Sequence, residues 1–167
     1  ETFVAQLTMQ AIGFRHALRL AVAATVGVLV YSLLGLPHGL WVTLTIVVIL
    51  KPSYGGTIDM TLQRVGGTVL GAVLAALVVA LAPGLLWLEL LMVPLVVLCF
   101  AIKPISYVLF VTLLTPLVIV LIDLTGAGDW TTAALRVANT VLGGAITVAA
   151  SYLLWPTADG QRLPQQL

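Results

Sequence analysis

The chain has 167 residues, of which 61% are hydrophobic and 8% are charged, and its mean hydropathy is +1.18. So few polar residues cannot cover one apolar core in water, and we therefore expect lipid to solvate much of the protein. The formal net charge of +1 and the lack of any basic cluster predict that the chain does not bind nucleic acid.

Residues 1–14 place their apolar side chains near one face and are predicted to form an interfacial amphipathic helix. Six apolar segments follow, each bounded by Pro, Gly or charge, and each is predicted to cross a membrane as a helix. They cover residues 16–36, 39–50, 65–85, 86–102, 105–122 and 133–155. The polar residues 157–167 are predicted to be a cytoplasmic tail. The expected fold class is therefore an all-α membrane protein with six transmembrane helices.

The second apolar segment is short, about 18 Å at 1.5 Å per residue, against a hydrocarbon core of about 30 Å. The fifth segment carries Pro116 in its interior. Two interpretations follow from these features. Either both segments are interrupted helices that meet at a central binding site, or one is a tilted helix and the other has an ordinary proline kink.

One motif occurs twice, 72 residues apart, as RVGGTVLG from Arg64 to Gly71 and as RVANTVLG from Arg136 to Gly143. This spacing predicts two related three-helix units over residues 15–84 and 85–156. Because each unit has an odd number of helices, the second unit is expected to be inverted relative to the first.

The basic residues predict the orientation. Six of them fall on the side that holds both termini, and Arg136 alone falls on the other; the six are Arg15, Arg19, Lys51, Arg64, Lys103 and Arg162. The positive-inside rule then predicts that both termini lie in the cytoplasm. The expected location of the protein is the inner membrane of the cell.

Arg64 and Arg136 are predicted to open helices, where free backbone N–H groups and an arginine fork would both attract a carboxylate. Thr68 and Thr140 lie one turn further on and are candidates to orient that carboxylate. The alternative interpretation is that both arginines extend to lipid phosphates and anchor their helices.

Other residues are given supporting roles. Lys51 and Lys103 would add positive field at the cytoplasmic side, and Trp41 is a candidate to stack on an aromatic substrate. Asp123 is either a coupling carboxylate or a solvated helix end. The small residues predicted to allow close helix packing are Gly67, Gly71 and Gly143. The hydroxyls of four residues either line the path or bond to their own helix backbone; these are Thr43, Thr45, Thr112 and Thr115.

Tyr107 and most of the tryptophans lie near predicted membrane interfaces and are assigned to an aromatic belt. We find neither a nucleophile and base at one-face spacing nor a metal-ligand spacing around His16, His38 or the single Cys99. The sequence therefore predicts a protein that is not an enzyme and that uses no metal and no cofactor.

The chain resembles the fusaric acid resistance-like (FUSC) superfamily over nearly its whole length. The resemblance lies in RHALR from Arg15, LPHGLWVTLT from Leu36, LKP from Leu50, the two repeated motifs and the closing Trp155-Pro156. It implies an architecture similar to plant aluminium-activated malate transporters, which are anion channels. It also implies a soluble domain after the helices, and a second six-helix unit or further copies of the chain as partners. The chain begins without Met, and we expect it to be part of a longer protein.

The resemblance implies the movement of small organic anions, with efflux of aromatic carboxylic acids as the main expectation. Two alternatives stay open, a passive anion channel and a membrane scaffold for a soluble domain that transports nothing.

Overall fold

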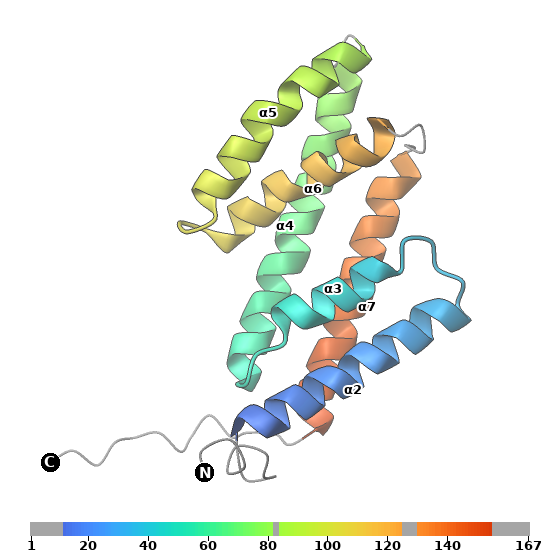
Figure 1. Ribbon diagram of the computed structural model, residues 1–167, viewed down its shortest axis with the longest axis vertical. Coiled ribbons are helices and arrows are strands. Elements are labelled where there is room, and N and C mark those ends of the chain that lie inside the picture. Colours follow the sequence, from blue (N-terminus) through green and yellow to red (C-terminus); the bar gives the residue numbers. More distant parts are fainter. Residues whose placement is uncertain (1–11, 82–83, 125–129, 155–167) are drawn as a thin grey trace, which may run out of the picture. The chain divides into compact units, whose positions relative to one another are not determined.

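The computed structural model describes residues 12–81, 84–124 and 130–154, and all the regular secondary structure in these ranges is α-helical. This confirms the predicted all-α class. The helices, in chain order, are α2 (Ile12–Leu33), α3 (Leu40–Ile49), α4 (Tyr54–Leu81), α5 (Leu85–Ile102), α6 (Tyr107–Leu124) and α7 (Trp130–Leu153) (Figure 1). The predicted interfacial helix lies largely, and the predicted tail wholly, outside the described residues.

Three of the described helices are long and apolar enough to cross a membrane, over Gly13–Leu33, Tyr54–Leu81 and Thr131–Leu153. The apolar stretches Leu40–Ile49, Leu86–Ile102 and Tyr107–Ile122 are shorter. Large apolar side chains are exposed on the helices, including Leu33 at 84% exposure and Leu62 at 66%. Such a surface is suited to lipid contact. The count of six crossings and the inverted repeat stay predictions.

The chain forms two compact units, and unit 1 consists of residues 1–61 and 142–167. Within it α2 packs against α3, and the buried core includes Ala23, Val42, Ile46 and Ala150. After α2, Gly35 takes a φ of 60° and the backbone N–H of Leu36 donates to the carbonyl of Tyr31 at 3.0 Å. This left-handed glycine ends the helix as a C-terminal cap.

The helix α3 has ten residues and is therefore about 15 Å long. The prediction of an unusually short second helix is confirmed. It starts beside Gly39, whose Cα lies so close to the ring of Tyr31 that a Cβ there would collide with it. The turn after α3 is held by the hydroxyl of Thr57, which accepts a bond from the backbone N–H of Lys51 at 3.0 Å.

Unit 2 consists of residues 62–141, and in it α5 packs against α6 (Figure 1). Its buried core includes Cys99, Phe110 and Val111. Both helices contain an internal proline, Pro94 in α5 and Pro116 in α6. Because α6 runs without a break from Tyr107 to Leu124, the predicted interruption of the fifth segment is not found, and Pro116 lies inside a continuous helix.

Glycines bring α4 and α6 into close contact within unit 2. A Cβ at Gly67 would lie 2.8 Å from Cβ of Val111 and 2.9 Å from the carbonyl oxygen of Val108. A Cβ at Gly71 would lie 2.6 Å from the carbonyl oxygen of Thr112. Gly143 has the equivalent environment in unit 1, because a Cβ there would lie 2.8 Å from the carbonyl oxygen of Val42 on α3. A side chain at any of these positions would separate the helices.

Gly71→Ala is therefore expected to lower the free energy of unfolding by about 1–3 kcal/mol, because the added methyl group overpacks the α4–α6 contact. Gly66→Ala is the matched control, since it lies on the same helix with nothing within 4 Å of a built Cβ. The control should be neutral or up to about 1 kcal/mol more stable, given the helix propensity of alanine. Thermal unfolding in detergent measures both, and equal melting temperatures for the two variants would contradict the packing described here.

Candidate functional site

Arg64 and Arg136 lie inside their helices, so the prediction that each opens a helix is wrong. Arg64 is about 15 Å from the start of α4, and Arg136 is about 9 Å from the start of α7. The backbone N–H groups at both positions are past the first turn and are taken up by the helix, so they do not attract an anion. Any attraction comes from the guanidinium groups themselves.

Both arginines are buried, with Arg64 at 7% exposure and Arg136 at 5%. Each belongs to unit 2. The acidic side chains that the structure describes, Asp59 and Glu89, are both exposed. Unit 2 thus holds two cationic side chains in its interior, where the burial of charge is costly unless it is compensated.

Thr68 and Thr140 are buried and make identical contacts. Each hydroxyl donates to the carbonyl of the arginine four residues earlier, at 2.8 Å in both cases. Their protons are therefore engaged by their own helices, as is common for threonine in a helix. The substrate-orienting role predicted for them would require these bonds to break.

Arg64 has a partner that the sequence did not reveal. Its Nη1 donates to the hydroxyl of Tyr107 at 3.0 Å, while its Nε is buried and makes no hydrogen bond with any described residue. The close approach at Gly67 explains this contact, because Gly67 lies one turn after Arg64 and packs on Val108, the neighbour of Tyr107. No sequence pattern links a tyrosine at the start of one helix to an arginine two helices earlier.

The threonines of α3 and α6 differ in how their hydroxyls are satisfied. Thr112 and Thr115 donate to carbonyls of their own helix, at 2.9 Å and 3.0 Å. In unit 1 the hydroxyls of Thr43 and Thr45 are buried and have no hydrogen-bond partner in the described part of the chain. The short helix α3 therefore carries two buried hydroxyls whose hydrogen bonds the described residues do not satisfy.

The remaining predicted residues are spread over both units. Lys103 is exposed in unit 2, with Nζ 5.5 Å from the ring centre of Phe110. Lys51 and Trp41 are half-buried in unit 1. The side chain of Asp123 lies outside what the structure describes. Among the predicted substrate-pathway residues whose side chains the structure describes, those in unit 2 are Arg64, Arg136, Thr68, Thr140 and Lys103.

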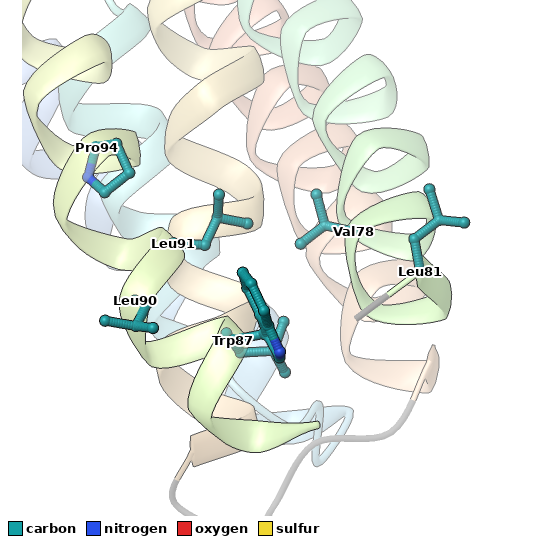
Figure 2. A pocket seen from close by; sticks show the side chains of 7 residues that line it. Val78, Leu81, Trp87, Leu90, Leu91 and Pro94 are labelled. Carbon is teal, nitrogen blue, oxygen red and sulfur yellow. The ribbon is translucent and has the colours of Figure 1, made fainter. Parts of the chain in front are cut away.

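An apolar cavity of about 400 Å³ lies between the end of α4 and the first half of α5 (Figure 2). Its lining consists of Val78, Leu81, Trp87, Leu88, Leu90, Leu91 and Pro94. None of these side chains carries a charge or a hydroxyl, and the indole N–H of Trp87 is the one polar side-chain group in the lining. The cavity is not part of the arginine site.

Comparison with known proteins decides the family. The family described as fusaric acid resistance protein-like matches residues 23–150, which include both arginines and both threonines. The chain belongs to this family. The sequence resemblance is thereby confirmed at the family level.

Several relatives in this family come from bacteria. Inner membrane protein YccS of Escherichia coli (strain K12) is 32% identical over 92% of this chain and 21% of its own length. Uncharacterized protein ORF2 of Neisseria gonorrhoeae is 28% identical over 90% of this chain and 36% of its own length. The chain therefore spans about a fifth to a third of the length of these relatives. No solved structure matches the chain at a significant level.

Arg64→Met is expected to raise the free energy of unfolding by about 1–4 kcal/mol in the absence of organic anions. The reason is that an apolar side chain of similar length replaces a buried charge that makes no ion pair with a described residue. Chemical unfolding in detergent measures the change. Arg15→Met, at a half-buried position of α2, serves as the control. An Arg64→Met protein less stable than wild type would show that the burial of this charge is already compensated.

Proposed function

We propose that the protein is a multi-pass inner-membrane transporter that moves small organic anions, aromatic carboxylates in particular, out of the cell. Membership of the fusaric acid resistance protein-like family, a relative named as an inner membrane protein and the long apolar helices support this proposal. Because the relatives are much longer, the proposal extends to a soluble domain and to a second six-helix unit or further copies of the chain as partners.

The observation that carries the proposal is the buried Arg64. A guanidinium at 7% exposure in a long apolar helix, with a neutral tyrosine as its described partner, has hydrogen-bond donors that only an acceptor can satisfy. An organic carboxylate supplies both the missing charge and the missing acceptors. Ionisable residues inside membrane helices commonly mark the route of a substrate.

The helix bounds support two related three-helix repeats, residues 15–84 and 85–156, which we propose to be inverted relative to each other. Adding 72 to the bounds of α4 gives residues 126–153, and α7 occupies Trp130–Leu153. The same shift places α3 at residues 112–121, within the observed α6, Tyr107–Leu124. Inverted units that present equivalent arginines from opposite directions suit alternating access, in which one site faces each side of the membrane in turn.

In this mechanism Arg64 and Arg136 bind the carboxylate and pass it along the interior. Lys51 and Lys103 raise its concentration at the cytoplasmic side, and Trp41 stacks on its ring. Asp123 is the coupling carboxylate if a proton gradient drives the efflux. The buried threonine hydroxyls of the short helix α3 offer further contacts along the route.

We expect Arg64→Gln to reduce saturable benzoate flux into proteoliposomes at least about tenfold, because a charge-assisted contact to the carboxylate is lost. Arg15→Gln provides the matched loss of charge at a half-buried position and should keep most of the flux. Arg64→Gln protein that inserts normally and transports at the full rate would contradict the proposal.

The same flux assay distinguishes the three candidate functions, which are a coupled exporter, a passive anion channel and a membrane scaffold. Flux that depends on an imposed proton gradient supports a coupled exporter, whereas flux that persists without the gradient and carries current indicates an anion channel. The absence of benzoate flux from the full-length protein in either condition would point to the membrane scaffold.

A further inference from the structure

Tyr107 has a fixed position at the start of α6. The hydroxyl of Ser106 accepts from the backbone N–H of Leu109 at 3.4 Å and so caps the helix. The ring of Tyr107 packs on Phe110, with ring centres 6.1 Å apart. Phe110 is in turn held by Phe100, also at 6.1 Å, and by the ammonium of Lys103 above its face. The phenol is thus braced by a small aromatic cluster.

The hydrogen bond between Tyr107 and Arg64 uses only the acceptor oxygen of the phenol and only Nη1 of the guanidinium. The Tyr107 oxygen accepts from Nη1 at 3.0 Å, and its own proton reaches no acceptor among the residues that the structure describes. On the guanidinium, Nε is buried without a hydrogen bond. The edge formed by Nε and Nη2 is the one that a planar carboxylate binds with both oxygens. By holding Nη1, Tyr107 sets the direction in which that edge points.

The residue pair Arg64 and Tyr107 is not repeated in the second copy of the motif. The position 72 residues before Tyr107 is Gly35, which has no side chain and forms the left-handed turn after α2. The position 72 residues after Gly67 is the buried Asn139. The motif repeats, but the phenol does not. Tyr107 lies beside Arg64, whereas the residue 72 positions before Tyr107 has no side chain to place beside Arg136. The surroundings of the two arginines therefore differ.

We propose that Tyr107 is a positioning residue that orients the guanidinium of Arg64 to bind a carboxylate through its Nε–Nη2 edge. The inference rests on the proposed function and adds to it the residue that sets the affinity of the Arg64 site. Without the phenol oxygen, the long arginine side chain regains rotamer freedom and must be ordered by the substrate itself.

The test is the concentration dependence of benzoate flux through the full-length protein in proteoliposomes. Tyr107→Phe keeps the ring that packs on Phe110 and removes only the oxygen. We expect its KM for benzoate to rise about tenfold, the range for losing a hydrogen bond to a charged group, while kcat stays within about twofold of wild type. Tyr152→Phe, an exposed ring beside Tyr54 in unit 1, is the control and should leave both constants unchanged.

The outcomes are distinct. An unchanged KM together with a lower kcat would mean that Tyr107 serves folding or the conformational step, and would overturn the inference while leaving the transport function intact. An unchanged KM and kcat would likewise overturn it. If wild-type protein shows no saturable benzoate flux at all, the proposed function fails, and this inference fails with it.

Discussion

A positive charge held inside an apolar helix is the constraint on which the rest of the structure depends. Arg64 lies about 15 Å along α4 and is almost completely buried, and the partner described for it is the neutral Tyr107. Burying a charge in this way is costly unless it is compensated, and in the proposed function a bound organic anion supplies that compensation. The glycines of α4 contribute to the same arrangement. Gly67 and Gly71 let α6 approach closely, and that approach places the tyrosine beside the arginine.

The two copies of the repeated motif make similar contacts in the structure. In both copies the threonine donates to the carbonyl of the arginine at 2.8 Å, and in both the last glycine meets a backbone carbonyl of a neighbouring helix. The threonine and the last glycine of the motif therefore each make the same kind of contact in both copies. The differences matter equally, since Asn139 stands where the first copy has Gly67, and Tyr107 has no counterpart at Gly35. In the proposed transport function, these differences would let the two arginines hold a substrate with unequal strength.

The sequence predicted the helical class, the short second helix and the interior Pro116 because hydropathy and helix-breaking residues report on these features directly. It misplaced the start of α4, because residues 54–63 are too polar to read as part of a membrane segment. In the structure Ser53 caps this stretch, its hydroxyl accepting from the backbone N–H of Gly56 at 3.3 Å, and the helix begins at Tyr54. Tyr107 was missed for another reason. Its contact joins residues 43 positions apart in different helices, and single-sequence patterns carry no information about such a pair.

The most direct test of the central claim is to locate a heavy-atom-labelled substrate in an experimental structure of the full-length protein. With 4-bromobenzoate bound, anomalous scattering identifies the bromine and thus the orientation of the ring. We predict a carboxylate within hydrogen-bond distance of the Arg64 guanidinium, at its Nε–Nη2 edge. A protein carboxylate paired with Arg64, and bromine density elsewhere, would contradict it.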